Sequence, residues 1–221
     1  QDAGTLDEVE VIYDAKGRCY EADDGLRRET DMAQLAKLKP VFDRPFGNVT
    51  AGNSAQVTDG AAWLILASED AVARHGLPVL AQIRDSQWAG LDPAQMGLGP
   101  VYAMAPLLMR QGFDSQDIDY WEINEAFAAQ VLGCLAAWND DAFCRTQLGR
   151  DLPFAPIPRE RLNVDGGGIS LGHPVGASGA RVVLHLIQVL RQRQARRGIA
   201  SLCIGGGQGG AMLVEAMEGV A

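Results

Sequence analysis

The sequence predicts an α/β fold in which a mixed sheet is flanked by helices and preceded by an irregular N-terminal segment. From position 48 onward, short apolar runs typical of buried strands alternate with runs that have helical periodicity. Glycine makes up 26 of the 221 residues and gathers late in the chain, where strands end and the backbone must turn. A tight glycine turn joins the last two expected strands, which indicates a closing hairpin.

The stretch before position 48 differs from the rest of the chain. Between Asp2 and Asp31 there are ten acidic residues and four basic ones, and polar residues interrupt the short apolar runs. We expect a solvated, loop-rich segment that packs on another part of the protein. Within it, Thr30 is expected to cap a short helix through Lys37, which Pro40 ends.

The remaining elements follow from local patterns taken in order. The continuous apolar run 61–67 suits a strand buried on both faces, and a short helix over 68–75 ends at Gly76. Alternating residues predict a strand at 79–88, and helical spacing predicts a helix over 100–111. We further expect strands at 118–123, 162–164, 199–204 and 211–216, helices at 125–138 and 178–193, and a long connection over 139–161.

Composition excludes several classes of protein. Hydrophobic residues make up 47% and charged residues 21%, so the chain can bury a core and is not disordered. The formal net charge of −9 argues against a nucleic-acid partner, because such binders carry a basic surface. No apolar run approaches the ~18 residues that span a bilayer, so we expect no membrane partner.

The four cysteines, Cys19, Cys134, Cys144 and Cys203, are far apart and form no CxxC pair. This spacing argues against a disulfide scaffold or a metal site and favours a reducing, cytoplasmic location. The chain begins at Gln1 without a signal-peptide pattern, so we expect a processed chain or a piece of a longer one.

Three segments carry residues suited to catalysis. Asn124 stands where a buried strand passes into a helix, so its amide either caps the helix or points into the crevice at the strand's carboxyl end. His173 lies in the loop 166–179, in which six of fourteen residues are glycine, and Pro174 fixes its exit. We expect His173 to be catalytic; the alternatives are a histidine that bonds the loop backbone and a loop that cradles phosphate.

Cys203 nears the end of a buried strand and meets a second glycine turn. It is either a small core residue or a reactive thiol beside N–H groups that stabilise an oxyanion. We expect His75 and His185 to be structural and Cys134 and Cys144 to be inert. A cysteine, a histidine, an asparagine and N–H-rich turns together suggest acyl transfer, or carbanion chemistry next to a carbonyl.

These segments resemble the signature sequences of thiolases, the acetyl-CoA C-acyltransferases. The similarity is carried by NEAFAAQ, GGGISLGHPVGASGAR and CIGGGQG, and extends in the same order to VTAGN at 49–53, TDGA at 58–61 and MGLGP at 96–100. It covers nearly all of the chain from Thr30 to Ala216. It implies a thiolase-like fold, with 1–52 ending the loop domain, 53–76 ending the N-terminal domain and 77–221 forming the C-terminal domain.

The resemblance also implies an activity: carbon–carbon bonds between acyl-CoA units are made or cleaved through an acylated cysteine, as in fatty acid β-oxidation. No segment here resembles the surroundings of the family's nucleophilic cysteine. We therefore expect an N-terminal thiolase half, separate or missing, as a partner, and a dimer or tetramer as the assembly. Coenzyme A thioesters are expected as substrates, with no cofactor.

The family roles carry over to individual positions. His173 resembles the histidine that activates the nucleophile and helps to hold the thioester oxygen in an oxyanion hole. Asn124 resembles the residue that positions a water in that oxyanion hole, and Cys203 resembles the acid/base cysteine. The backbone N–H of Gly205 resembles a donor in the second oxyanion hole. His173 and Cys203 are therefore expected to converge at one edge of the sheet.

The substrate-binding residues implied by the resemblance are Met96, Phe127, Ser54 and Ala55; ordinary core packing is the alternative for Met96 and Phe127. Ser54 stands one position earlier than the pantetheine-contacting serine of many thiolases, which places its contact with coenzyme A in doubt. The sequence also fits two rival functions, a 3-oxoacyl synthase and a catalytically incomplete module that binds coenzyme A or a partner.

Overall fold

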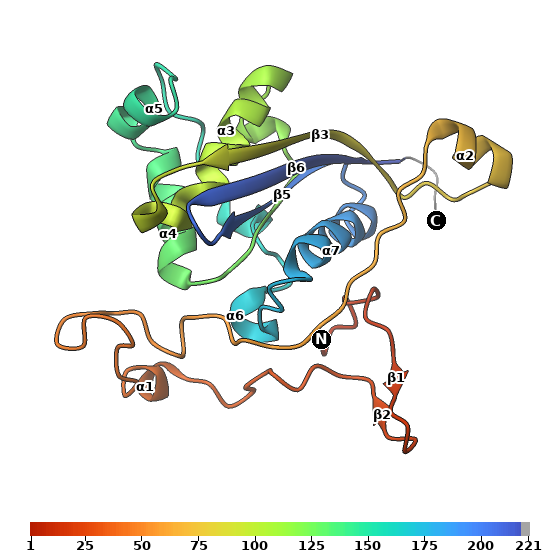
Figure 1. Ribbon diagram of the computed structural model, residues 1–221, viewed down its shortest axis with the longest axis horizontal. Coiled ribbons are helices and arrows are strands. Elements are labelled where there is room, and N and C mark those ends of the chain that lie inside the picture. The colour runs from red at the N-terminus through yellow and green to blue at the C-terminus, as the bar shows by residue number, and fades with distance from the viewer. Residues whose placement is uncertain (218–221) are drawn as a thin grey trace.

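The computed structural model describes residues 1–217, which form a four-stranded mixed sheet covered by helices on both faces (Figure 1). The strand order is β3 (Ala81–Gly90), β6 (Gln208–Ala216), β5 (Arg197–Ile204) and β4 (Tyr120–Ile123). β4 and β5 run parallel, whereas β6 is antiparallel to both of its neighbours. The predicted fold class, including the closing hairpin β5–β6, is confirmed.

One face of the sheet carries α3 (Gly99–Gln111), α4 (Ala128–Trp138) and α5 (Asp141–Gln147), and the other carries α7 (Ser178–Gln192) (Figure 1). The core on the first face includes Trp121 and Trp138. Trp138 stacks on Phe154 with ring centroids 4.1 Å apart and donates its indole N–H to Ser115 Oγ. This pairing satisfies the one polar group of a fully buried tryptophan.

The core on the second face is built by α7. Its buried residues recur at helical spacing and pack on Ala200 of β5 and Val214 of β6; they are Val182, Val183, Leu186, Ile187 and Leu190. The helix predicted over 178–193 is thus present with nearly the same bounds.

Several helix ends are set by the residues that the sequence indicated. The side chain of Ser68 accepts from Ala71 N at the start of α2 (Glu69–His75), and Gly76 ends that helix in the left-handed conformation. Gly112 ends α3 in the same way. In α1 (Met32–Leu35), however, the cap is Asp31 and not Thr30, because the Asp31 carboxylate accepts from Gln34 N.

Residues 61–67 are not a strand, which corrects the prediction. They run extended with no sheet partner among the described residues, and Trp63, Ile65 and Leu66 are 85%, 91% and 77% exposed. A strand exists only where a neighbour accepts its hydrogen bonds, and this stretch instead leads into α2, which lies beyond the end of the sheet (Figure 1).

Three further predictions need correction. Residues 162–164 make only single bridges, Leu162 pairing with Trp121 of β4. The connection 139–161 contains α5 and the 3₁₀ helix η3 (Arg159–Arg161). Helix α4 begins at Ala128, because Phe127 instead pairs with the distant Ser54. The short helix α6 (Gly168–Leu171), inside the glycine loop, was not predicted.

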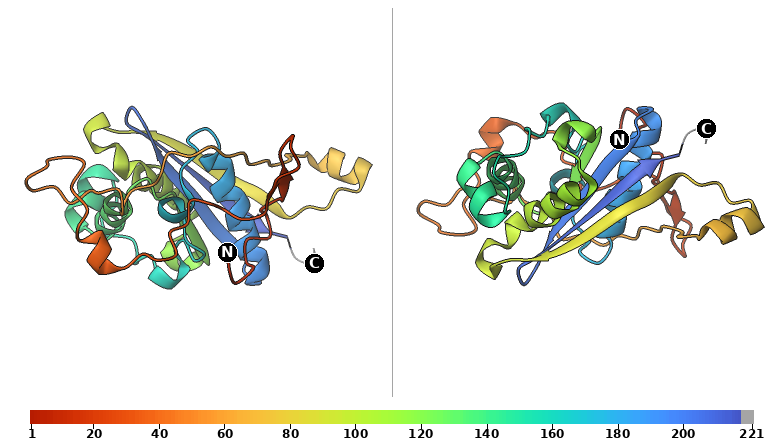
Figure 2. Two further views of the ribbon diagram at one scale, coloured as in Figure 1. Left: turned by 90° about the horizontal axis from the view of Figure 1, so that it is seen from below. Right: turned by 90° about the horizontal axis from the view of Figure 1, so that it is seen from above.

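The N-terminal segment contains the short hairpin β1 (Ile12–Tyr13) and β2 (Cys19–Tyr20) and runs along the α6–α7 side of the domain, as both views in Figure 2 show. It is fastened there by a buried polar cluster in which Glu8 Oε1 lies 2.5 Å from His185 Nδ1. Glu122 and Asp165 approach the other ring nitrogen at 3.9 and 3.6 Å. Among the helices within residues 1–217, none combines the length and apolar character that a bilayer span requires.

The unfolding free energy is expected to fall as the pH rises from about 5 to about 8. Burial raises the pKa of Glu122 to about 8, well above its value in the unfolded chain. The folded state therefore holds a proton that the unfolded state releases near pH 4.5. Burial opposes a charge on His185, but its bond to Glu8 and the neighbouring carboxylates raise the pKa of the ring overall. The folded state therefore also holds the proton of His185 more tightly, so the unfolding free energy falls further as the pH rises above the ordinary pKa of histidine.

Urea unfolding at several pH values measures this slope, and Glu122→Gln should reduce it by up to about 1.4 kcal/mol per pH unit, the value for one proton. The exposed Glu29→Gln is the matched control and should leave the slope unchanged. An unaltered slope in the Glu122 variant would show that this carboxyl is not protonated in the folded protein.

Candidate active site

Asn124 and His173 come together at the carboxyl edge of the parallel strands β4 and β5. The backbone N–H of Asn124 donates to Ser201 O of β5 at 2.9 Å, and its Nδ2 lies 3.4 Å from His173 Nε2. Helix α4 begins after Phe127 without a side-chain cap, so Asn124 does not cap it. The amide is only 3% exposed, and its Oδ1 has no hydrogen-bond partner within the described residues.

His173 is held by the backbone around it. The backbone N–H of His173 donates to Gln56 O at 2.7 Å. Gly172, the preceding residue, has φ 90°, and a Cβ added to it would lie 2.4 Å from the side chain of Thr58. Burial, followed by the charge of Arg181, lowers the pKa of the ring. His173 is therefore neutral at physiological pH and can accept a proton.

Asn163 and Glu125 fasten the glycine loop to the end of β4. The Asn163 side chain accepts from Ile123 N and donates to Ile123 O, both at 2.9 Å. The Glu125 carboxylate accepts from Ile169 N and from Asn163 Nδ2 at 3.2 and 3.1 Å. These contacts fix the spacing between Asn124 and the loop that carries His173.

Cys203 lies one residue before the end of β5, paired with Gly209 of β6. It is 7% exposed, and burial raises the pKa of its thiol, so the sulfur is protonated at neutral pH. Cys203 follows Ser201, the partner of Asn124, by two positions and so shares the sheet edge with Asn124 and His173. Within the described residues, no hydrogen bond joins it to either of them.

The turn that follows Cys203 requires its glycines. Gly206 and Gly207 have φ of 88° and 85°, and a Cβ on Gly207 would lie 2.3 Å from Leu91 O. Gly205, by contrast, is exposed and faces open space, since an added Cβ there would meet no atom within 4 Å. Its backbone is thus accessible at the rim of the site.

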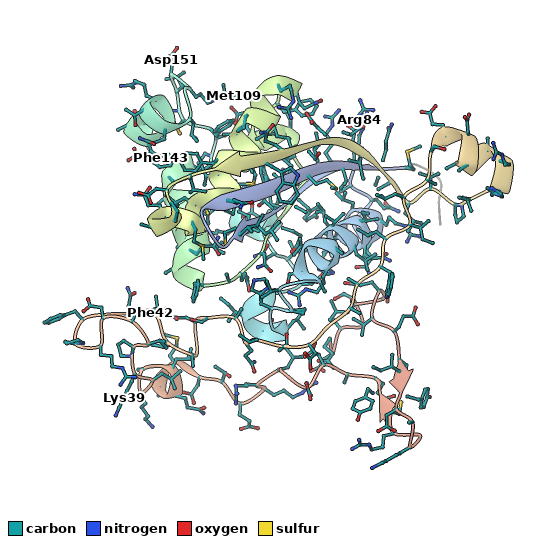
Figure 3. All side chains as sticks on the ribbon, in the orientation of Figure 1. Lys39, Phe42, Arg84, Met109, Phe143 and Asp151 are labelled. Carbon is teal, nitrogen blue, oxygen red and sulfur yellow. The ribbon has the colours of Figure 1, made fainter. Side chains whose placement is uncertain are left out.

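The four predicted substrate-binding residues fall into two places. Phe127, Ser54 and Ala55 form one group: Phe127 pairs with Ser54, and Ala55 N donates to Ala126 O. Ser54 donates its hydroxyl to Thr50 O at 2.7 Å, and the ring of Phe42, labelled in Figure 3, meets Phe127 edge-on.

Met96 belongs to the second place, the 3₁₀ helix η1 (Pro93–Leu98), where it is half-buried. The chain just before η1 contacts the glycine turn, since Leu91 N donates to Gly207 O at 2.9 Å. Met96 therefore lies on the side of the site that carries Cys203 and Gly205.

Ser178, whose Oγ lies 2.6 Å from His173 Nδ1, was not predicted from the sequence. Asn163 and Glu125 were not predicted either. A serine at the first position of an expected helix reads as a capping residue, which hides its contact with the histidine. The available signal was the position of Asn163, three residues before the glycine loop that begins at Gly166.

Comparison with known proteins gives a consistent assignment. The family model "Thiolase, C-terminal domain" matches residues 77–216, and "Thiolase, N-terminal domain" matches residues 2–70. The chain is 40% identical to the mitochondrial trifunctional enzyme subunit beta of Bos taurus and 41% to the probable acetyl-CoA acetyltransferase of Escherichia coli. Each alignment covers 98% of this chain, but 46% and 52% of the relative.

Solved structures agree with these matches. Human mitochondrial 3-ketoacyl-CoA thiolase superposes with a TM-score of 0.82 at 36% identity, and the Bacillus anthracis acetyl-CoA acetyltransferase with 0.83 at 39%. Both alignments cover 98% of this chain and 51% of the solved chain. The chain thus spans about half the length of the proteins that it matches, and it belongs to the thiolase family.

Proposed function

We propose that this chain is the C-terminal part of a thiolase that cleaves 3-oxoacyl-CoA with coenzyme A, or condenses acetyl-CoA in the reverse direction. The nucleophilic cysteine would be supplied by an N-terminal half outside these residues. The observation that carries the proposal is the Asn124–His173 pair at the carboxyl edge of the sheet, where Asn124 Oδ1 is buried and has no hydrogen-bond partner among residues 1–217. Such an acceptor fits a water or substrate group that donates to it.

In the cleavage direction, His173 Nε2 would take the proton of the nucleophilic thiol, and the thiolate would attack the 3-oxo carbon. Breaking the bond between carbons 2 and 3 leaves an acyl-cysteine and the carbanion of acetyl-CoA. Cys203 would give its proton to that carbanion, and its raised pKa supports this role because the thiol is protonated beforehand. Coenzyme A would then give its thiol proton to the Cys203 thiolate and attack the acyl-cysteine, which releases the shortened acyl-CoA. The nucleophilic cysteine would leave as a thiolate and recover its proton from His173.

Two sets of donors would stabilise the oxyanions of these steps. Asn124 and His173 would serve one thioester oxygen, and the backbone N–H of the exposed residue Gly205 would serve the other. Met96 and Phe127 would line the acyl and pantetheine pocket from its two sides, with Ser54 and Ala55 beside Phe127. Coenzyme A thioesters enter as substrates, and no cofactor is part of the proposal.

A cytoplasmic, reducing location and a homodimer or tetramer complete the proposal. Four free cysteines support the first. Similar proteins include the mitochondrial trifunctional enzyme subunit beta and a peroxisomal 3-ketoacyl-CoA thiolase, so a cytoplasmic location would set this chain apart from them.

The test joins the N-terminal half of the Escherichia coli relative to this chain and measures thiolysis of acetoacetyl-CoA. Cys203→Ala is expected to lower turnover by about 10²–10⁴-fold, the usual contribution of a general acid. The exposed Cys19→Ala is the matched control and should retain activity.

Two outcomes of this assay would count against the proposal. Full turnover in the Cys203 variant would remove its acid/base role. A preference for the same acyl group on acyl carrier protein would favour a 3-oxoacyl synthase instead.

A further inference from the structure

Ser178, the first residue of α7, is fully buried, and its hydroxyl lies between two groups. Its Oγ is 2.6 Å from His173 Nδ1 and 3.0 Å from the carbonyl oxygen of Pro174. A carbonyl can only accept, whereas a serine hydroxyl has one proton and two lone pairs. Serine in a helix commonly donates its hydroxyl proton to the carbonyl four residues earlier, which here is that of Pro174. Ser178 Oγ then has a lone pair left for His173 Nδ1.

The other side of the imidazole indicates the same arrangement. Nε2 lies 3.4 Å from Nδ2 of Asn124, and an amide nitrogen donates. A proton on Nε2 would point at this N–H group, whereas a lone pair on Nε2 can accept from it. The two contacts, from α7 and from the end of β4, therefore agree on a neutral ring with its proton on Nδ1.

We propose that Ser178 is a positioning residue that holds His173 in the Nδ1–H tautomer and so turns a lone pair at Nε2 toward the reacting groups. Its catalytic meaning rests on the proposed function, but the tautomer is a property of this chain. The geometry of the turn supports it: Ala177 N and Ser178 N both donate to Pro174 O at 2.8 Å, which fixes Ser178 relative to His173. Burial keeps the ring neutral, the state in which the tautomer matters.

The test is long-range ¹H–¹⁵N spectroscopy of the chain labelled with ¹⁵N-histidine, which separates protonated from unprotonated ring nitrogens. The chain has three histidines, and His173→Gln identifies the signals of His173 by their loss. We expect a protonated Nδ1 and an unprotonated Nε2 near neutral pH. A protonated Nε2, with Ser178 donating to Nδ1, would overturn the proposal.

Variants then test whether Ser178 is the cause. Ser178→Ala should shift the tautomer ratio by roughly tenfold toward Nε2–H, the factor set by one ordinary hydrogen bond, and Ser178→Thr should restore it. The control is Ser170→Ala, which removes a hydroxyl of the same loop that donates to Gly167 O at 3.0 Å. An unchanged ratio in Ser178→Ala, with the fold intact by circular dichroism, would overturn the assignment. If that variant does not fold, the tautomer of the unaltered chain and of Ser178→Thr decides.

Activity separates this inference from the proposed function. In the joined enzyme, Ser178→Ala should lower kcat with little change in KM, because the serine touches the histidine and not the substrate. If the joined enzyme is inactive without any substitution, the proposed function fails while the spectroscopic result still stands.

Discussion

A preparation of this chain alone is expected to leave acetoacetyl-CoA uncleaved when coenzyme A is added. Thiolysis needs a cysteine that becomes a thiolate beside a base. Burial raises the pKa values of Cys134, Cys144 and Cys203, so these sulfurs stay protonated. Cys19 is exposed, but it lies on the β2 hairpin, far from the end of β5 in Figure 1. The three buried sulfurs therefore keep their protons, and the exposed one lies away from His173, so none of them is expected to form the acyl-enzyme.

The measurement is the loss of acetoacetyl-CoA in the presence of a 221-residue preparation verified by mass spectrometry. The same chain joined to a relative's N-terminal half is the positive control and should be active. Turnover by the verified chain alone would mean that one of its own cysteines is the nucleophile, and Cys19→Ala and Cys203→Ala would then identify it.

The chain alone is also expected to self-associate through residues 57–66, which we call the apolar arm. Val57, Trp63 and Ile65 are each at least 85% exposed, and Leu66 is 77% exposed. Exposed apolar runs of this length, with free backbone groups alongside, bind one another or a covering partner. We expect the apolar arm to pair with the N-terminal half in the assembled enzyme.

Light scattering at increasing protein concentration measures this association. The double variant Trp63→Ser, Ile65→Ser should move the chain toward monomer, with less binding of a hydrophobic dye. The control Leu152→Ser removes a 70% exposed apolar residue elsewhere and should leave association unchanged. A well-behaved monomer of the unaltered chain, with no second polypeptide present, would contradict the expectation.

The parts of the fold that depend on neighbouring residues could be predicted from the sequence. The short helix that ends at Gly76, the end of α3 before Gly112 and the amphipathic helix α7 follow from local chemistry and agree with the structure. Elements that depend on distant partners could not. The late start of α4 follows from the pairing of Phe127 with Ser54, which no local pattern contains.

The apolar run 61–67 is a second element whose structure depends on distant partners. Its composition suits a buried strand, but a strand also needs neighbours, and within the described residues this run has none. The apolar pattern of these residues indicates that they would be buried in a sheet, but it does not indicate whether the strands that would flank them are present.

The site divides in a similar way. Asn124, His173 and Cys203 were identifiable because each stands where a strand or glycine loop ends, and the structure places all three at one sheet edge. Ser178, Asn163 and Glu125 were missed because their side chains act on groups that only the folded chain brings near. Residue type and position mark Asn124, His173 and Cys203 as candidates, whereas the hydrogen bonds around them depend on how the chain folds.

The side chain of Asn163 has a consequence for assembly. By bonding both the N–H and the C=O of Ile123, it takes the place of a neighbouring strand and closes the outer edge of β4. Leu162 closes the position before it by pairing with Trp121. At the opposite edge, β3 presents ten residues whose regular pairing with β6 is broken by an irregularity between Ile83 and Asp85. A strand from another molecule that extended this sheet would therefore have to add along β3, because the edge of β4 is closed.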